Sequence, residues 1–209
     1  MIKESNISEN NIHTVFDKIL GRFDKEKLLK QHARVIWMTG LSGSGKTTIA
    51  RGIELELNQR LFLTQILDGD NIRAGINNNL GFSVDDRLEN IRRISEVSKL
   101  FLNCGIICIN SFISPTIEIR QIAYDIIGRE NIIEIFVNAP LEVCEQRDTK
   151  GLYKMAREGK IKQFTGIDSP FEPPANPDIE LRTAELSVED SLDKCLRYIL
   201  PIITYRHSL

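Results

Sequence analysis

The sequence reads Gly40-Leu41-Ser42-Gly43-Ser44-Gly45-Lys46-Thr47 between two apolar patterns of different kinds. Before it stands the short run Val35-Ile36-Trp37-Met38, which is typical of a buried strand, and after it residues 47–61 repeat apolar side chains at helical spacing. A strand, a glycine-rich loop and a helix in this order allow backbone N–H groups to curl around phosphate oxygens. The stretch therefore predicts a phosphate-binding loop inside an α/β domain.

The fixed residues of this loop indicate which phosphates it takes. Lys46 can bridge the β- and γ-phosphates of a nucleotide, and the Thr47 hydroxyl is placed to ligate Mg²⁺. The positive end of the following helix adds to the attraction. An unspecific glycine-rich turn would not need the Lys-Thr pair. We expect ATP and Mg²⁺ to bind here, with ATP contacts from Gly40, Leu41, Ser42, Gly43, Ser44, Gly45, Lys46, Thr47 and Thr48.

Outward from the loop, short apolar runs alternate with helical patterns. Further strands are predicted at 63–67, 106–109 and 132–137, and further helices at 87–103, from Ser114-Pro115 onward, at 140–147 and at 187–203. Parallel strands need crossover connections, which helices of this length supply. The sequence therefore predicts an α/β fold of the three-layer phosphate-loop NTPase type, with a parallel sheet and helices on both faces.

The composition of the chain argues against several classes of protein, namely nucleic-acid-binding, membrane and disulfide-rich proteins. The 209 residues carry a formal net charge of −2, so no general attraction to nucleic acid or to anionic lipid is built in. No apolar run approaches the length of about 18 residues that marks a membrane span. Four cysteines are too few for a disulfide scaffold in a chain of this size. These observations predict a cytoplasmic protein without nucleic-acid or membrane partners.

Acidic and basic side chains follow the second predicted strand, where a parallel sheet presents its ligands. Asp70 can orient an acceptor hydroxyl, accept its proton or hold the water shell of the metal, so Thr47 and Asp70 are the predicted metal residues. Arg73 can grip an anionic acceptor through two hydrogen bonds. The alternative is that Asp68-Gly69-Asp70 is only a turn.

Seven segments together resemble the adenylylsulfate kinase family, in its order and at its spacing, across residues 34–205. They are Gly40–Thr48, Leu67-Asp68-Gly69-Asp70-Asn71-Ile72-Arg73, Leu80-Gly81-Phe82-Ser83, Glu89-Asn90-Ile91-Arg92-Arg93-Ile94, Ser111-Phe112-Ile113-Ser114-Pro115, Lys150-Gly151-Leu152-Tyr153 and Phe164-Thr165-Gly166-Ile167-Asp168-Ser169. The resemblance implies transfer of the ATP γ-phosphate to the 3′-hydroxyl of adenosine 5′-phosphosulfate. The products would be ADP and 3′-phosphoadenosine 5′-phosphosulfate, in sulfate assimilation.

The acceptor of that reaction is an anionic nucleotide, and the matching segments carry suitable side chains. Arg73, Arg87 and Asn90 supply hydrogen-bond donors, and Phe82 and Phe164 can enclose an adenine. Phe82 can instead belong to the core, and Arg87 can instead be a solvated helix charge. The resemblance implies acceptor contacts from Asp70, Asn71, Ile72, Arg73, Phe82, Arg87, Asn90, Ile113, Ser114, Lys150 and Phe164.

Ser114 has two compatible interpretations. It precedes Pro115, so we expect it to cap a helix that has proline at its first position, and a helix N-terminus at this edge also favours phosphate. The family's matching serine is described as a phosphoserine intermediate, so the resemblance adds Ser114 to Asp70 and Lys46 as catalytic residues. In-line transfer needs no covalent step, and we therefore expect Ser114 to lie near the phosphates without being obligatory.

The charged segment 145–162 places Arg147, Lys150, Lys154 and Arg157 at helical spacing. This pattern predicts a mobile lid that closes on ATP, with Arg147 as an ATP contact. A salt-bridged surface helix is the alternative.

The first 33 residues are predicted to form a helical arm beside a phosphate-loop kinase domain at 34–209. A helical face in the arm is formed by Ile12, Val15, Phe16, Ile19, Leu20 and Phe23. The arm matches the family poorly, and Thr116 stands where the family commonly has an aromatic residue or histidine. A homodimer is the family's expectation.

Two other functions remain open. Another small-molecule kinase, acting on a nucleotide, sugar or antibiotic hydroxyl, would explain the loop and Asp70 but not the segments at 80–83 and 164–169. A non-catalytic nucleotide-binding subunit is the second alternative. Intact Lys46 and Asp70 argue against it.

Overall fold

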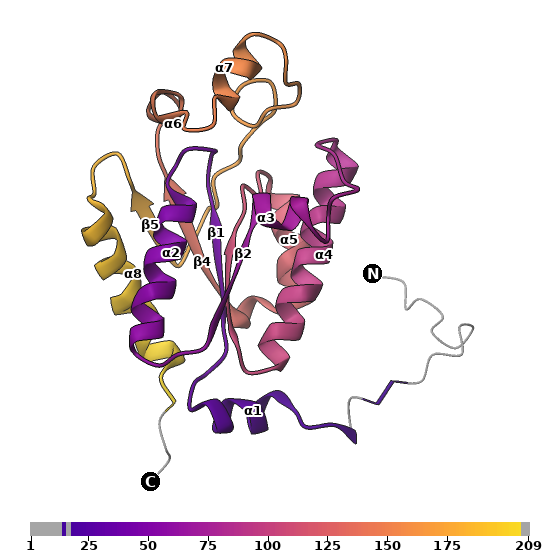
Figure 1. Cartoon of the computed structure of the whole chain (residues 1–209), viewed down its shortest axis with the longest axis vertical. Coiled ribbons are helices and arrows are strands. Elements are labelled where there is room, and N and C mark those ends of the chain that lie inside the picture. The colour runs from indigo at the N-terminus through magenta and orange to yellow at the C-terminus, as the bar shows by residue number, and fades with distance from the viewer. Residues whose placement is uncertain (1–13, 16–17, 206–209) are drawn as a thin grey trace.

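The computed structural model describes residues 14–15 and 18–205. Its centre is a five-stranded parallel sheet with the strand order β2-β3-β1-β4-β5 (Figure 1). The strands are β1 (Val35–Thr39), β2 (Thr64–Asp68), β3 (Ile107–Ser111), β4 (Ile132–Asn138) and β5 (Ile179–Arg182). The helices are α1 (Arg22–Leu29), α2 (Lys46–Gln59), α3 (Gly69–Ala74), α4 (Val84–Asn103), α5 (Ile117–Ile127), α6 (Leu141–Arg147), α7 (Leu152–Arg157) and α8 (Val188–Ile203), with a short 3₁₀ helix at Arg129–Asn131.

Helices cover both faces of the sheet, so the predicted three-layer α/β fold is confirmed (Figure 1). Successive side chains of a strand point to opposite faces. Ile36 and Met38 of β1 therefore enter the core under α2 and α8, whereas Val35 and Trp37 enter the core under α4 and α5. All of β1 is buried, as expected of a central parallel strand.

The sequence did not predict β5 and α3. Strand β5 alternates the apolar Ile179 and Leu181 with charged residues, but the alternation spans only four residues and follows a proline-rich segment, so it is too short to stand out in the sequence. Helix α3 has six residues and begins where the turn was offered as an alternative. The Asp68 side chain caps it by accepting a hydrogen bond from the Asp70 N–H at 3.1 Å.

Among the described residues, the helical face predicted for the N-terminal arm is formed only at its last residue, Phe23, which lies in α1 with an exposed side chain. Val15, Ile19 and Leu20 lie outside any α-helix and are exposed, while Ile12 and Phe16 fall outside the described residues. An amphipathic face forms a stable helix only when a surface covers its apolar side.

The first helix of the described chain is α1, at the end of the molecule away from α6 and α7 (Figure 1). Arg22 holds it there by donating to Asn131 Oδ1 at 2.7 Å and to the Ala33 carbonyl. The boundary between an arm and a domain at residues 33 and 34 stays a prediction. In the described part of the chain, the helices are all too short or too polar to cross a membrane.

Candidate active site

The carboxyl ends of β1, β2 and β3 bring oxygen atoms together at one edge of the sheet. The register pairs Asp68 with Ser111, and Ser111 with Met38 beside the phosphate loop. From the first turn of α2, Thr47 Oγ1 donates to Asp68 Oδ2 at 2.9 Å and lies 3.5 Å from Ser111 Oγ. Hydroxyl and carboxylate oxygens are the donors that Mg²⁺ and its waters prefer, so this group could hold the metal. Thr47 was predicted for this role and Asp68 was not.

Three glycines shape the phosphate loop. Gly40, Gly43 and Gly45 have φ values of 151°, 74° and 105°, a region that L-residues rarely adopt. A Cβ at Gly40 would lie 2.4 Å from the Val137 carbonyl oxygen, and one at Gly43 would lie 2.9 Å from the Cys144 carbonyl oxygen. The loop is therefore pressed against the backbone of Val137 and Cys144 at positions where only glycine fits.

Lys46 lies inside this loop and is buried. Its Nζ donates to the carbonyl oxygens of Gly40 and Leu41 at 2.8 and 2.7 Å. Burial lowers the pKa of the amine from 10.5 to about 8, although Cys144 and Asp68 act in the opposite direction. The ammonium is thus partly stripped of water, and it forms no ion pair with any described residue, so a triphosphate would supply the missing anion.

Two further features show a cradle that fits a phosphate. The Ser44 hydroxyl is buried, and among the described residues it has no hydrogen-bond partner. No side chain in the described part of the chain caps α2, so the first N–H groups of this helix remain open to an anion. Of the other predicted contacts, Ser42 accepts a hydrogen bond from the Tyr153 hydroxyl at 2.9 Å, and Thr48 is exposed on α2.

Asp70 stands opposite the loop, in the first turn of α3. Its carboxylate is exposed and forms an ion pair with Lys150, which comes from the connection between α6 and α7. The two residues were predicted from different segments, and the structure brings them together. Asn71 and Ile72 are their neighbours on α3, and Ile72 packs against the core under α4 and α5.

Arg73, Phe82 and Arg87 form a connected group beside α3. The Arg73 guanidinium lies 4.4 Å from the centroid of the Phe82 ring and donates to the Gly81 carbonyl at 2.7 Å. Arg87 donates to the Phe82 carbonyl at 3.0 Å and to Thr165 Oγ1 at 2.9 Å. The Phe82 side chain is 59% exposed, so its alternative place in the core is wrong, and Arg87 is not merely a solvated charge.

Arg87 also donates to the Gln163 carbonyl at 2.5 Å, which ties the segment before Phe164 to the segment of Phe82. The two predicted aromatic residues are thus linked through one guanidinium. Phe164 meets Tyr153 edge to face at 5.0 Å between ring centroids. Asn90 is buried and accepts a hydrogen bond from Asn77 Nδ2 at 3.0 Å, so it supports this wall of the site from inside.

The predicted cap at Ser114 is wrong. Helix α5 begins two residues later than expected, and Thr116 is its N-cap, accepting a hydrogen bond from the Ile119 N–H at 3.3 Å. An N-cap residue adopts extended backbone geometry, as Thr116 does with φ −117° and ψ 158°. Ser114 instead has φ 38°, and its hydroxyl accepts a hydrogen bond from Trp37 Nε1 at 3.2 Å.

Ile113 precedes Ser114 and lies close to the phosphate loop. Its carbonyl accepts a hydrogen bond from Thr39 Oγ1 at 2.7 Å, and the Gly40 N–H approaches the same oxygen at 3.5 Å. The segment that carries Ser114 is therefore joined directly to the end of β1.

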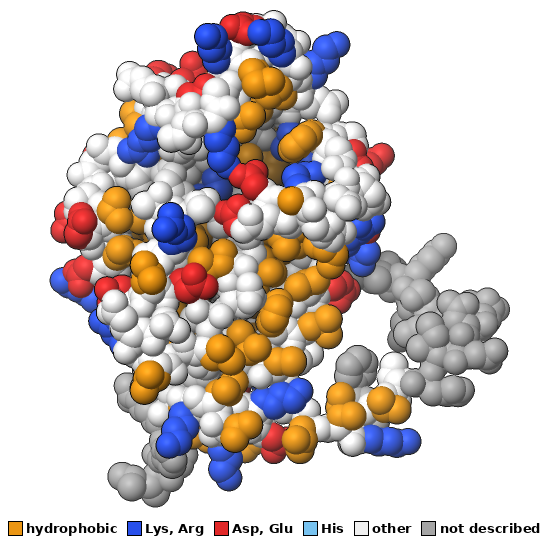
Figure 2. Space-filling model, in the orientation of Figure 1, with side chains coloured by type: hydrophobic (Ala, Val, Ile, Leu, Met, Phe, Trp, Pro, Cys, Tyr) orange, Lys and Arg blue, Asp and Glu red, His pale blue; other side chains and the backbone are white. Residues whose placement is uncertain are grey.

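The charged segment 145–162 is not one helix. Helices α6 and α7 are separated by a turn, in which the Asp148 carboxylate accepts hydrogen bonds from the N–H groups of Tyr153 and Lys154 at 3.1 Å each. The predicted common face of the basic residues is therefore wrong. Both helices stand beyond the carboxyl ends of the strands (Figure 1), and Figure 2 shows Lys and Arg side chains gathered at that end.

Arg147 lies at the end of α6 beside the loop after β5. It donates to the Thr183 carbonyl at 2.7 Å, and Thr183 Oγ1 donates to the Ser44 carbonyl of the phosphate loop at 2.7 Å. Arg147 is thus fixed close to the nucleotide loop, as an ATP contact requires. Thr183 was missed, because only the three-dimensional pairing of β5 with β4 brings it there.

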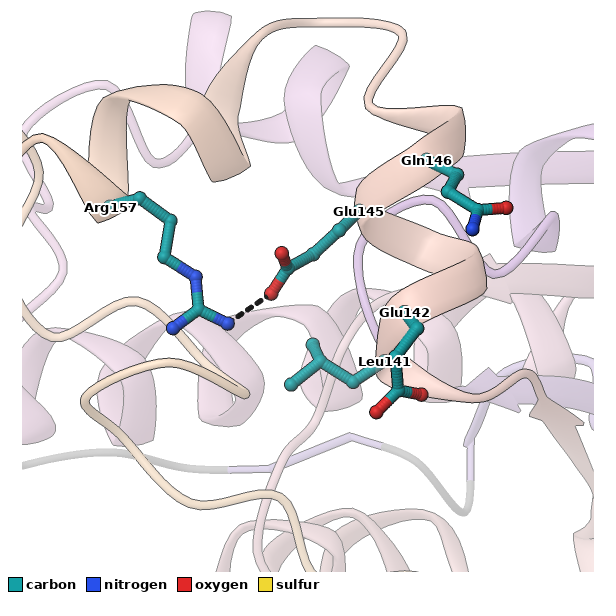
Figure 3. Close-up of a pocket in the computed structure, with 5 residues that line it drawn as sticks. All are labelled: Leu141, Glu142, Glu145, Gln146 and Arg157. Carbon is teal, nitrogen blue, oxygen red and sulfur yellow. Dashed lines mark hydrogen bonds and ion pairs between the residues drawn. The ribbon is translucent and has the colours of Figure 1, made fainter.

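A pocket of about 410 Å³ opens between α6 and α7 (Figure 3). Arg157 of α7 points across it and forms an ion pair with Glu145 of α6 at 2.5 Å. The remaining lining residues are Leu141, Glu142 and Gln146. The contact connects α6 and α7, while the function of this segment as a lid that closes on ATP stays a prediction.

The chain is similar to known kinases over most of its length. The family described as adenylylsulphate kinase matches residues 32–182 of the chain. The adenylyl-sulfate kinase of Bacteroides thetaiotaomicron is 58% identical over 195 residues, which are 93% of this chain and 97% of that protein. The adenylyl-sulfate kinase of Clostridium acetobutylicum is 51% identical over 180 residues, which are 86% of this chain and 90% of that protein.

A solved structure gives the same result. The APS kinase of Mycobacterium tuberculosis, in complex with AMPPNP and APS, superposes with a TM-score of 0.78 at 41% sequence identity. The match covers 81% of this chain and 98% of that one.

Proposed function

The chain belongs to the adenylylsulfate kinase family, and from this premise we propose that its site transfers the γ-phosphate of ATP to the 3′-hydroxyl of adenosine 5′-phosphosulfate. The products are ADP and 3′-phosphoadenosine 5′-phosphosulfate. The observation that carries the proposal is the position of Asp70 and Lys150 opposite the phosphate loop, with the Phe82 and Phe164 segments joined beside them by Arg87.

ATP binds in the phosphate loop. Its phosphate oxygens accept hydrogen bonds from the N–H groups of the loop and displace the carbonyl contacts of Lys46, whose ammonium then neutralises charge on the transferred group. Mg²⁺, bound near Thr47 and Asp68, would supply further charge neutralisation. Arg147 fixes the nucleotide on the side of the loop after β5.

The acceptor lies between the Phe82 and Phe164 segments. Arg73 and Arg87 hold its phosphosulfate group, and Asp70 accepts the proton of the 3′-hydroxyl as that oxygen bonds to the γ-phosphorus. Lys150 keeps the Asp70 carboxylate turned toward the site and ties the lid to α3. Asn71, Ile72, Asn90 and Ile113 complete the acceptor wall.

We propose that transfer is direct and that Ser114 contacts the acceptor without forming an obligatory phosphoserine. The Ser114 side chain is buried and held by the Trp37 indole, which supports a binding role. The Ser114→Ala variant should keep catalysis with a raised KM for the acceptor. Loss of all turnover in this variant, with ATP binding intact, would contradict direct transfer.

The experiment that tests the function measures ADP release from Mg·ATP with and without adenosine 5′-phosphosulfate. The native chain should need the phosphosulfate, and Asp70→Asn should lose at least about a hundredfold in rate, the usual scale for removal of a general base. Asp85→Asn is the matched control, because Asp85 is an exposed carboxylate in the first turn of α4. Equal ADP release without the acceptor, or none with it, would overturn the assignment.

Two further properties are proposed with this function. All four cysteines are free, which supports a reducing cytoplasmic location.

Exposed apolar side chains near the N-terminus support a homodimer, namely Val15, Ile19, Leu20, Phe23 and Leu28. Light scattering of the native chain and of a Leu20→Glu/Phe23→Glu variant tests the second proposal, since a dimer held by these side chains should become a monomer.

A further inference from the structure

A buried ion pair lies behind the segment that carries Ser114. Arg120 of α5 and Glu134 of β4 face each other at 3.6 Å between Nε and Oε1, and each side chain is only 3% exposed. Glu134 Oε1 has no hydrogen-bond partner among the described residues. A buried pair of this kind contributes little to stability compared with apolar side chains of the same volume, so its presence calls for another explanation.

The second observation is the contact that Arg120 makes beyond Glu134. Its Nη1 donates to the backbone carbonyl of Ser114 at 2.9 Å, and Thr39 Oγ1 reaches the same carbonyl at 3.3 Å. Ser114 has φ 38°, in the left-handed region that is unfavourable for a residue with a side chain. Such a conformation persists only where surrounding contacts enforce it, and it is found preferentially at functional sites.

The third observation concerns the Ser114 hydroxyl. Trp37 Nε1 donates to Ser114 Oγ at 3.2 Å, and among the described residues this hydroxyl donates to no acceptor. Its hydrogen therefore remains available for an anionic oxygen of a substrate. Trp37 thus contacts the side chain of Ser114, and Arg120 contacts its backbone carbonyl.

We propose that Arg120, anchored by Glu134, is a positioning residue that holds Ser114 in its left-handed conformation so that the Ser114 hydroxyl faces the acceptor nucleotide. The proposal rests on the proposed function for the identity of that acceptor. It explains why charge is retained in the core between α5 and β4: the guanidinium links that core to the catalytic edge of the sheet.

The test separates positioning from folding with a charge-free pair. In Arg120→Met/Glu134→Leu both buried charges are removed together, which leaves no unpaired ion and should preserve the fold. We expect the KM for adenosine 5′-phosphosulfate to rise at least about tenfold and kcat to fall, since small misplacements can cost about a hundredfold. The KM for ATP should stay within about twofold, a margin well below that effect.

Trp37 is the only tryptophan in the chain, and its fluorescence gives a readout independent of activity. Since its indole N–H is bonded to Ser114, displacement of Ser114 should shift the emission of the double variant and of Arg120→Lys, in which the shorter amine can pair with Glu134 but not also reach the Ser114 carbonyl. Arg120→Lys carries the test if the double variant does not fold.

The matched control is Gln31→Met. Gln31 is equally buried, and its Nε2 donates to the carbonyls of Leu63 and Gly105 at 3.0 and 2.8 Å, at the opposite end of the strands. It should lower the melting temperature without changing either KM or the Trp37 emission.

A folded double variant or Arg120→Lys with native acceptor KM and native emission would overturn the proposal, and so would equal increases in the two KM values. Failure of the native chain to phosphorylate the acceptor would instead overturn the proposed function, while the emission shift would still decide the position of Ser114.

Discussion

Replacing Lys46 by methionine should make the ligand-free protein respond differently to pH. In the folded chain burial lowers the pKa of Lys46 to about 8, against an ordinary value of 10.5. Between these values the unfolded chain binds more protons than the folded chain, so the free energy of unfolding rises with pH. Burial of the charged amine lowers the free energy of unfolding by about 3 kcal/mol below pH 8, and this destabilisation disappears by about pH 10.5.

The size of this effect is best measured as a difference in the free energy of unfolding between the native chain and Lys46→Met. Lys46→Met has a side chain of similar length and no charge, and the loss of the hydrogen bonds to Gly40 and Leu41 shifts its stability by an amount that depends little on pH. Other titrating groups are common to both proteins. The free energy of unfolding of the native chain minus that of the variant should therefore rise by about 2.5 kcal/mol between pH 7 and pH 10.

Urea unfolding without nucleotide at pH 7, 8, 9 and 10 measures this difference. A difference that stays flat across the series would refute the reasoning, because it would mean that Lys46 is as well solvated in the folded loop as in the unfolded chain. Calorimetry adds a second check. Phosphate oxygens beside Lys46 should raise its pKa back toward the ordinary value. Binding of Mg·ATP at pH 8 should therefore be coupled to the uptake of about half a proton by Lys46 in the native chain, and this uptake should be missing in Lys46→Met.

Two further substitutions test the walls of the nucleotide site. Asp68→Asn keeps a side-chain oxygen that can cap α3 but removes the negative charge beside Thr47. The Mg²⁺ concentration for half-maximal activity should therefore rise about ten- to a hundredfold. An unchanged Mg²⁺ titration would exclude Asp68 from the metal site. Thr183→Val removes the hydrogen bond to the Ser44 carbonyl and should raise the KM for ATP about tenfold, the effect of one lost hydrogen bond, with the acceptor KM unchanged. Steady-state kinetics with each substrate varied measures the second effect, and an ATP KM within twofold of the native value would contradict it.

The parts of the site that the sequence predicted are those that depend on neighbouring residues. Gly40, Lys46 and Thr47 belong to one strand–loop–helix unit, whose backbone geometry and chemistry are set within a few residues. Asp70 was found for a related reason, because it closely follows a predicted strand. Local pattern was sufficient for both.

The parts that were missed depend on contacts between distant segments. Thr183 reaches Ser44 only because β5 pairs with β4, and β5 itself is too short to leave a periodic signal. Asp68 and Asp70 stand two residues apart, and the register of β2 with β3, together with the cap of α3, decides which of them meets Thr47. The helical spacing across 145–162 predicted one helix, and this prediction failed because of a local contact. The Asp148 side chain accepts hydrogen bonds from backbone N–H groups and so stabilises a turn in place of a continuous helix.

Several unfavourable features of this fold lie at the edge of the sheet where we propose that the substrates bind, although Lys30 and Leu61 also have positive φ values at the opposite edge. The buried Lys46 ammonium, the unpartnered Ser44 hydroxyl and the left-handed Ser114 all lie at the carboxyl edge of the sheet, and the Glu134 carboxylate is joined to that edge through Arg120. At the opposite edge a comparable buried group, Gln31, has every contact satisfied inside the chain. Groups whose positions the fold already fixes need little reorganisation when a substrate arrives, which is the condition for electrostatic stabilisation of a transition state. We therefore expect the stability that the chain gives up at this edge to be recovered as substrate binding and catalysis. Substitutions at this edge should accordingly lower activity with a smaller loss of stability than substitutions elsewhere in the core.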